Sequence, residues 1–200
     1  MKKAVLTVLA CGLMCVGLTA CGATASSPSS SDSGSSAATV SSNNNSAPAQ
    51  TAQSIELNQT VTNENLELTL TGVEWTDKIE KQLSEYTSTE VTASSNGADV
   101  LLVVRGTFKN LGGSNYSTSA MTVTCKANDK YDLSGSVFPY DSIKPLSTGE
   151  LSFYIPMSNE MKDTFKSGTM NLKFKSCSMD GDAIQINSDV IGEYELKITV

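Results

Sequence analysis

Apolar and polar residues alternate over several short stretches between Ile55 and Val200, and this alternation constrains the fold more than any other feature. Successive side chains of a β-strand point to opposite faces, so an apolar residue at every second position indicates a strand with one buried face. The buried faces are expected at Leu66, Leu68 and Leu70; Met121, Val123 and Cys125; Leu151, Phe153 and Ile155; Met170, Leu172 and Phe174; and Tyr194, Leu196, Ile198 and Val200. Short strands separated by turn residues predict an all-β domain, an antiparallel β-sandwich, over residues 55–200.

The stretch Val100–Asn110, VLLVVRGTFKN, begins with five consecutive apolar residues before the alternation resumes. A strand that is apolar on both faces is buried on both, so we expect this one at the centre of a sheet. The apolar parity of an earlier stretch changes at Gly72, which indicates either a β-bulge or the end of that strand. Residues 110–115 and 128–130 have the composition of turns.

The polar connection over residues 76–99 is longer than an ordinary hairpin loop. Within it, residues 77–86 have apolar side chains at i, i+4 and i+7, beginning at Ile79. Asp77 and Glu80 have the spacing of a helix capping box. We therefore predict a short helix over residues 77–86 and disorder over part of the remaining connection.

The N-terminus has the pattern of a secretory signal, with two lysines followed by an apolar run that ends before Cys21. The run is shorter than the ~20 apolar residues that a membrane-spanning helix needs. Residues 18–21, Leu-Thr-Ala-Cys, resemble the lipobox of bacterial lipoproteins, in which the cysteine thiol accepts a diacylglyceryl group and becomes the first residue after cleavage. Cys11 and Cys15 lie within the signal and are expected to be removed with it.

The resemblance implies a lipoprotein signal peptide over residues 1–20 and a lipidated Cys21. Composition indicates a linker that continues to residue 54, followed by the folded domain over residues 55–200. The linker is rich in Ser, Ala and Asn and contains one charged residue and no aromatic residue, so we expect it to be disordered. Two or three acyl chains on one residue give stable anchoring. The protein is therefore expected on the outer face of the cytoplasmic membrane, at the cell surface, attached through lipid without spanning the bilayer.

The charge balance argues against nucleic acid as a partner. Without Lys2 and Lys3 the chain keeps 12 basic residues against 21 acidic ones, and Arg105 is its single arginine. Sequence-independent binding to phosphate backbones needs clustered Lys and Arg, and the sequence contains no such cluster.

Cys125 and Cys177 are the two cysteines that remain after processing. An even number of cysteines in an exported domain favours a disulfide between them. The strand parities oppose this pairing, because Cys177 is out of phase with Met170, Leu172 and Phe174 unless a bulge or the end of the strand lies at Ser176. Two buried free thiols are the alternative.

The residue inventory opposes most enzyme mechanisms. The chain has no histidine, which excludes Ser-His and Cys-His activation and the commonest zinc ligand. No lysine of the domain has a serine three residues before it, so the S-x-x-K arrangement of penicillin-interacting proteins is absent. Asp180-Gly181-Asp182 is better explained as a turn than as a calcium loop, because Ile184 occupies a position that needs an oxygen ligand. We expect no catalytic residue, cofactor or metal, although paired carboxylates, which meet only in space, stay open.

The segment Phe138-Pro139-Tyr140 places two aromatic residues beside a proline in a stretch that otherwise has the composition of a loop. Exposed aromatic residues of this kind can form a recognition patch; alternatively, they close one end of the sandwich. Two function classes follow. The first is a non-enzymatic binding or structural module for an envelope protein or glycan, and the second is a cell-wall hydrolase that uses paired carboxylates.

Four segments of the domain together resemble the DUF4352-type immunoglobulin-like domain of Gram-positive lipoproteins, which is related in fold to the MPT63-like antigens. They are the LELTLTGVEW strand, the VLLVVRGTFKN strand, the segment IKPLSTGELSFYIP and the terminal strand. The most characteristic residues are Pro145, Gly149, Glu150, Phe153 and Pro156. The resemblance implies an immunoglobulin-like β-sandwich and carries over no catalytic residue.

Overall fold

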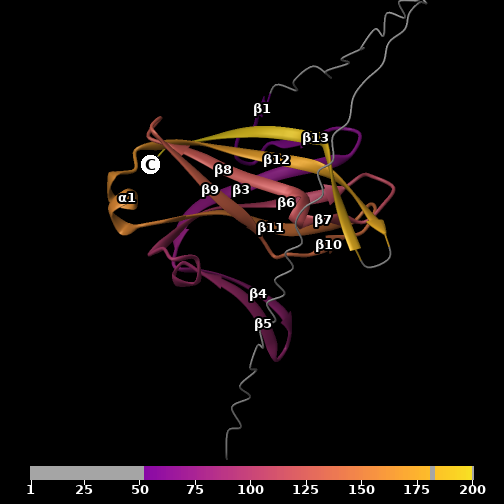
Figure 1. Ribbon diagram of the computed structural model, residues 1–200, viewed down its shortest axis with the longest axis horizontal. Coiled ribbons are helices and arrows are strands. Elements are labelled where there is room, and N and C mark those ends of the chain that lie inside the picture. The colour runs from indigo at the N-terminus through magenta and orange to yellow at the C-terminus, as the bar shows by residue number, and fades with distance from the viewer. Residues whose placement is uncertain (1–51, 181–182, 200) are drawn as a thin grey trace, which may run out of the picture. The chain divides into compact units, whose positions relative to one another are not determined.

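The computed structural model describes residues 52–180 and 183–199, and most of these are in strands (Figure 1). The elements in chain order are β1 (Gln53–Ser54), β2 (Thr60–Thr62), β3 (Leu66–Thr76), β4 (Lys78–Ser84), β5 (Thr87–Thr92), the 3-10 turn η1 (Ser94–Asn96), β6 (Val100–Asn110), β7 (Tyr116–Ser117), the 3-10 turn η2 (Thr118–Ala120), β8 (Met121–Ala127), β9 (Tyr131–Phe138), β10 (Ser142–Ile143), β11 (Thr148–Met157), α1 (Asn159–Thr164), β12 (Ser167–Asp180) and β13 (Ala183–Thr199). The predicted all-β sandwich is confirmed.

The sandwich is one long sheet that folds back on itself. Its strand order is β1-β13-β12-β8-β9-β11-β6-β3-β2. Strand β9 belongs to both layers, because residues 131–135 pair with β8 and residues 136–138 pair with β11. Strands β1, β13, β12 and β8 therefore form one layer, and β11, β6, β3 and β2 form the other. All pairings along this order are antiparallel except that of β1 with β13.

The core between the two layers contains the residues that the alternation predicts, apart from Val200, which lies outside the described residues. The inward-facing Leu, Val, Ile, Met and Phe side chains of β3, β6, β8, β11, β12 and β13 form one buried cluster. An aromatic group joins the layers: the ring of Phe174 on β12 lies 5.6 Å from that of Phe108 on β6 and 6.3 Å from that of Phe153 on β11. Tyr194 on β13 completes the group, with its ring 5.8 Å from Phe174.

Three local predictions are confirmed. Strand β6 lies between β11 and β3, and its first five residues, 100–104, are buried on both faces. The register of β3 against β6 shifts between Leu70 and Gly72 and the strand continues to Thr76, so the first of the two alternatives at Gly72, a bulge, holds. Residues 128–130 form the tight turn between β8 and β9, where Asn128 and Asp129 have φ of 51° and 55°, conformations that Asn and Asp tolerate better than most residues.

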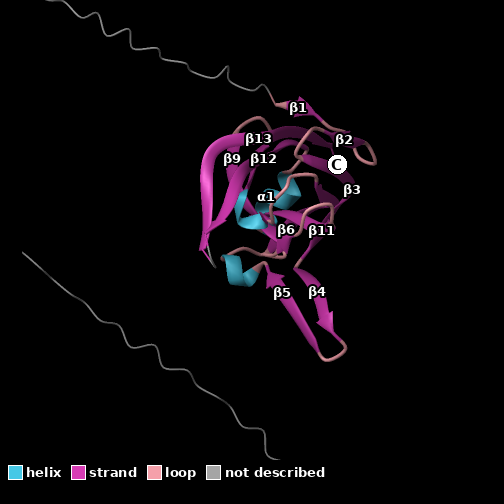
Figure 2. Ribbon diagram, turned by 90° about the vertical axis from the view of Figure 1, so that its right-hand side faces the viewer, coloured by secondary structure: helices cyan, strands magenta, loops and turns pink. Residues whose placement is uncertain are grey.

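The helix predicted over residues 77–86 is wrong, as is the disorder predicted for this connection. Strands β4 and β5 form an antiparallel hairpin, and Lys78 pairs with Thr92 at its base. Figure 2 shows that the hairpin extends away from the sandwich instead of packing along it. Ile79, Lys81 and Leu83 lie at every second position, which also fits one face of a strand. Strand β5, which is rich in β-branched residues, pairs with this strand, whereas a helix at residues 77–86 would leave β5 without a partner.

The folded region begins before the predicted boundary at residue 55. Gln53 and Ser54, which we assigned to the linker, form β1 and pair in parallel with Tyr194 and Glu195 of β13. Ile55 follows as a fully buried core residue, and its amide donates to the carbonyl of Glu195 at 2.9 Å. The signal, Cys21 and the remaining linker lie outside the described residues.

Candidate functional site

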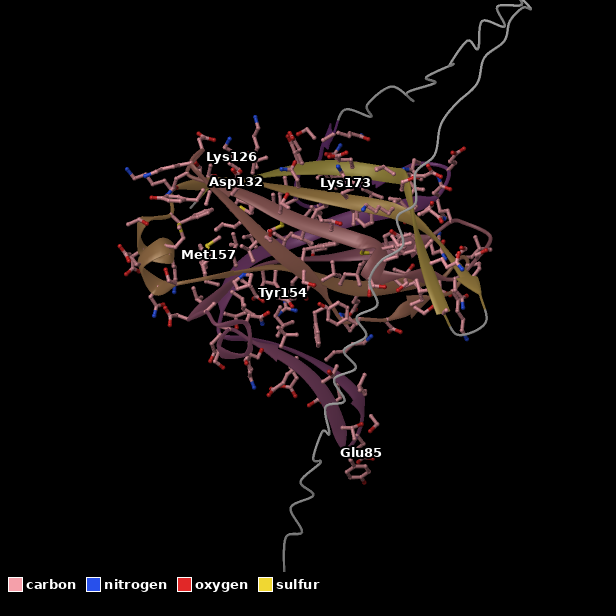
Figure 3. All side chains as sticks on the ribbon, in the orientation of Figure 1. Glu85, Lys126, Asp132, Tyr154, Met157 and Lys173 are labelled. Carbon is pink, nitrogen blue, oxygen red and sulfur yellow. The ribbon has the colours of Figure 1, made fainter. Side chains whose placement is uncertain are left out.

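The base of the β4–β5 hairpin covers part of the outer face of the layer that contains β11, β6, β3 and β2. Ile79 and Ala93 of the hairpin region pack with Phe138 against the outward-facing Leu101, Val103 and Tyr154 of β6 and β11, and Val91 lies against this cluster. Figure 3 shows Tyr154 on the side of the sandwich from which the hairpin extends. This second small core explains why the first residues of β6 are apolar on both faces, and it fixes the base of the hairpin to the sheet.

A pocket of about 290 Å³ lies beyond this cluster, between β4 and the outer face of the sheet. Its wall includes Ile79, Glu80 and Lys81 of β4 and the Phe138-Pro139 segment. Its floor is formed by three neighbouring strands, β3, β6 and β11. The floor residues are Thr71, Arg105, Gly106, Thr107, Glu150, Leu151 and Ser152. The pocket thus combines carboxylates, cationic groups, hydroxyl groups and an apolar side, and segments far apart in sequence supply them.

Arg105 is the best-held cation of this pocket. Its Nε donates to Glu74 Oε1 at 2.8 Å, and Nη2 forms an ion pair with the same oxygen. Nη1 donates to Ser152 Oγ at 3.3 Å. The guanidinium is therefore oriented along the sheet surface, and it is still about half exposed and open to further contacts.

A second hollow of about 420 Å³ lies on the other side of Lys81. It is lined by Leu83, Thr89, Glu90 and Val91 of the hairpin and by Tyr140 and Asp141 of the following loop. Lys81, Phe138 and Pro139 line both hollows. The Lys81 Nζ–Asp141 Oδ2 ion pair, at 3.2 Å, connects the hairpin with the loop between them.

The structure places the residues of the predicted aromatic segment differently, and none of them closes an end of the sandwich. Phe138 is buried in the small core, whereas Tyr140 is 65% exposed beside the second hollow. The Tyr140 hydroxyl lies 2.6 Å from Ser136 Oγ, so the exposed ring is held in position by a hydrogen bond. Pro139 lies between them on the wall of both hollows.

Two carboxylates, Glu80 and Glu150, line the first pocket, which makes them the pair that a hydrolase mechanism would use. A hydrogen bond from Ser88 and the charge of Lys78 lower the pKa of Glu80, and this side chain is exposed to water. A general acid in glycoside hydrolysis needs the opposite shift, which burial in an apolar site produces. The environment of Glu80 therefore opposes that role.

The disulfide predicted between Cys125 and Cys177 is wrong, because both cysteines are free. Cys125 is opposite Met170 in the β8–β12 ladder, whereas Cys177 is seven residues farther along β12, roughly 20 Å away at the rise of a strand. The register of β12 against β13 shifts on both sides of Lys175, and this bulge turns Cys177 toward the core. Its Sγ accepts a hydrogen bond from the Ser117 amide at 3.4 Å.

The two thiols should differ in reactivity. Cys125 is almost completely buried, and burial raises the pKa of its thiol from 9.0 to about 11. We expect a thiol reagent at neutral pH to modify Cys177, which is partly exposed, and to reach Cys125 only on unfolding. Unfolded protein purified without reductant should titrate two thiols per domain; a count of none would contradict the free cysteines.

The raised pKa also predicts a pH dependence of stability. Cys125 stays protonated in the folded protein to a higher pH than in the unfolded chain, so its contribution is fully present below pH 9. That contribution should decline as the pH rises from 9 to about 11. Urea titrations across this range should show a smaller decline for the Cys125→Ala variant than for the parent protein.

Within residues 52–180 and 183–199, no group of three or more Cys, Asp or Glu is arranged to hold a metal ion. Of the Asp180-Gly181-Asp182 turn, Gly181 and Asp182 lie outside the described residues. The same part of the chain contains no helix with the length and apolarity that membrane crossing requires.

Fold and site together define a β-sandwich protein with a projecting hairpin beside two surface hollows. No family model matches the sequence, and no curated protein matches it. An uncharacterized β-sandwich protein from Clostridium difficile 630 is similar in structure, with 20% identity and a TM-score of 0.53 over 74% of this chain and 95% of that chain. The YjhA protein of Bacillus subtilis has 12% identity and a TM-score of 0.41 over 71% and 97%. A candidate lipoprotein of the same organism, YcdA, has 13% identity and a TM-score of 0.38 over 70% and 38%. The first similarity supports the β-sandwich fold.

Proposed function

We propose that this protein is a lipid-anchored envelope protein whose β-sandwich displays a non-enzymatic binding module for another envelope protein or a glycan. The observation that carries the binding role is the β4–β5 hairpin, which extends from the sandwich and forms one side of two hollows. The opposite sides are supplied by the sheet surface around Arg105 and by the Phe138–Asp141 segment. Loops and hairpins on a rigid scaffold are common positions for binding residues.

The anchoring part of the proposal rests on the N-terminal sequence. The apolar run ends at Leu-Thr-Ala-Cys21, and a linker that is almost free of charge separates Cys21 from the folded domain. We further propose that the domain is of the DUF4352 type. The support for this is the sequence resemblance; of its characteristic residues, Gly149, Glu150, Phe153 and Pro156 all belong to strand β11.

Replacing Cys21 with serine should abolish lipid attachment, because serine lacks the thiol that accepts the diacylglyceryl group. Cells labelled with radioactive palmitate should incorporate label into the parent protein and not into the Cys21→Ser variant, which should leave the membrane fraction. Cys177→Ser is the matched control, since it removes another thiol and should leave labelling unchanged. Label in the Cys21→Ser protein would contradict the anchor.

The binding role is tested by capture from cell-surface extract with the mature protein in mild detergent. We expect a specific partner that the parent protein and the Tyr131→Ala variant retain and the Tyr140→Ala variant loses. Tyr131 is a suitable control because it is also a partly exposed tyrosine, located at the far end of β9 from the two hollows. Release of soluble sugars from purified cell wall, lost on Glu80→Gln or Glu150→Gln, would instead support a hydrolase.

A further inference from the structure

The β4–β5 hairpin forms its own two-stranded sheet, and no other strand of the described chain pairs with either of its edges. An isolated two-stranded ribbon is only marginally stable in water unless it gains further packing. Here the packing is confined to the base, around Ile79 and Ala93. The distal part exposes Leu83 (60%) and Tyr86 (87%), which are apolar or amphipathic residues at the tip.

The hydrogen-bond alternation shows which backbone groups of the hairpin point outward. The amide of Ala93 donates to the carbonyl of Asp77 at 2.8 Å, so residues 77 and 93 form a hydrogen-bonded pair. Antiparallel ladders alternate, so Ile79 with Val91 and Lys81 with Thr89 are also hydrogen-bonded pairs. The amides and carbonyls of the intervening residues, which are Glu80 and Gln82 on β4 and Ser88 and Glu90 on β5, therefore point away from the hairpin.

The outer edge of β5 is closed at its base and open farther out. At Thr92, the amide donates to Ser95 Oγ at 3.3 Å, and the carbonyl accepts from Ser95 Oγ and Asn96 Nδ2 at 2.7 and 2.9 Å. No comparable bond occupies the outward-pointing backbone groups of Ser88 and Glu90 among the described hydrogen bonds. Strand β4 has two lysines, a residue type that protects sheet edges, whereas β5 is made of Thr, Ser and Val with Glu90 as its single charge.

Charge and shape around this edge define its partner. Thr89, Glu90 and Val91 line the second hollow together with Leu83, Pro139 and Tyr140, so a strand beside β5 meets an apolar surface on one face. Glu90 borders this hollow, but strand alternation directs its side chain to the face of the hairpin opposite those of Thr89 and Val91. Glu85 lies at the tip of the hairpin (Figure 3). Neither Glu85 nor Glu90 forms an ion pair with a described residue, whereas Lys78 and Lys81 pair with Glu80 and Asp141.

From this juxtaposition we propose that β5 binds an extended polypeptide segment of another protein by strand addition, and that the segment alternates apolar and basic residues. Main-chain hydrogen bonds to Ser88 and Glu90 supply the pairing. Apolar side chains of the segment enter the hollow beside Tyr140, and its basic side chains lie next to Glu90 and Glu85. This inference rests on the proposed binding role and specifies the partner's chemistry.

The test titrates the full chain with three synthetic peptides that have blocked ends. They are (Lys-Val)₄, (Glu-Val)₄, and a (Lys-Val)₄ peptide with every second amide N-methylated, which keeps its charge and loses the donors of one edge. We expect (Lys-Val)₄ to bind at least about tenfold more tightly than either of the other two. Equal binding of the N-methylated peptide would overturn strand addition, because attraction between charges alone would explain it.

Variants of β5 locate the site. Ser88→Pro removes one outward-pointing amide without changing the charge, and proline is tolerated on a strand edge where the amide faces solvent. It should weaken (Lys-Val)₄ binding at least about tenfold, whereas Ser88→Ala, which also removes the hydroxyl, should not. Glu90→Lys should weaken binding as well. Glu64→Lys makes the same change in charge just before the start of β3, at the end of that strand away from the hairpin, and should not weaken binding. Failure of all three peptides to bind would overturn this proposal, while a partner captured from cell-surface extract would still support the binding role.

Discussion

Replacing Phe174 with alanine should lower the free energy of unfolding by about 3–5 kcal/mol, the range measured for buried phenylalanines. Phe174 is fully buried on β12, and its ring is in contact range of Phe108, Phe153 and Tyr194, which belong to both layers of the sandwich. Truncation leaves a cavity where the layers meet, and the neighbouring rings are too rigid to fill it.

Urea unfolding followed by tryptophan fluorescence measures this effect, since Trp75 packs at the edge of the same core. The matched control is Tyr86→Ala, which removes an aromatic ring that is 87% exposed at the tip of the hairpin. That change should alter stability by less than about 0.5 kcal/mol. A loss below 1 kcal/mol for Phe174→Ala would show that the two layers are not packed through this ring.

Gly135→Ala should destabilise the protein by at least about 3 kcal/mol, at the upper end of overpacking effects, because the obstruction is backbone. Gly135 is the residue of β9 at which the strand passes from one layer to the other. A methyl group there would overlap the carbonyl oxygen of Tyr154 and lie 2.6 Å from Ile155 Cδ1. A side-chain neighbour can rotate away, but the Tyr154 carbonyl is held within strand β11.

Gly72→Ala is the matched control, because it makes the same change within a strand where no atom lies within 4 Å of the added carbon. Alanine restricts the unfolded chain more than glycine does, so this variant should be unchanged or more stable by up to about 1 kcal/mol. Equal unfolding midpoints for the two variants would mean that β9 has room to change layers without a glycine.

Most of the sandwich could be predicted because each strand carries its burial pattern within its own residues. Leu66, Leu68 and Leu70 face inward as their alternation requires, and the parity change at Gly72 is a bulge. The five apolar residues of β6 were expected at a sheet centre, and they are buried on both faces. The cause of the outer burial, a small core under a hairpin, was not predictable from β6 alone.

The hairpin was misassigned because its residues satisfy two periods at once. Ile79 and Leu83 are four residues apart, as on one face of a helix, and they are also two positions either side of Lys81, as on one face of a strand. The choice between these structures is made by pairing with β5 and by burial of Ile79 against β6, which are contacts distant in sequence. Local propensity cannot supply that information.

The residues of the candidate site were likewise predictable only where the signal is local in the sequence. Tyr140 was recognisable as a candidate binding residue because aromatic residues beside a proline in a loop are conspicuous. Arg105 had a weaker signal, as the single arginine of the chain directly after five apolar residues, and its orientation depends on Glu74 and Ser152 from neighbouring strands. The disulfide prediction failed because the number of cysteines in the sequence does not say whether their positions in the sheet lie close enough to bond.

The parallel pairing of β1 with β13 has a mechanical consequence. Any tension carried by the chain that precedes the domain enters the fold at Gln53 and passes first to β13, through the short β1 ladder and the Ile55 amide. Parallel strands pulled along their length resist in shear, so these few bonds share the load instead of opening one after another. Because β1 is at the edge of the sheet order, its detachment leaves every other strand with its neighbours. We therefore expect β1 to detach under force before the sandwich unfolds.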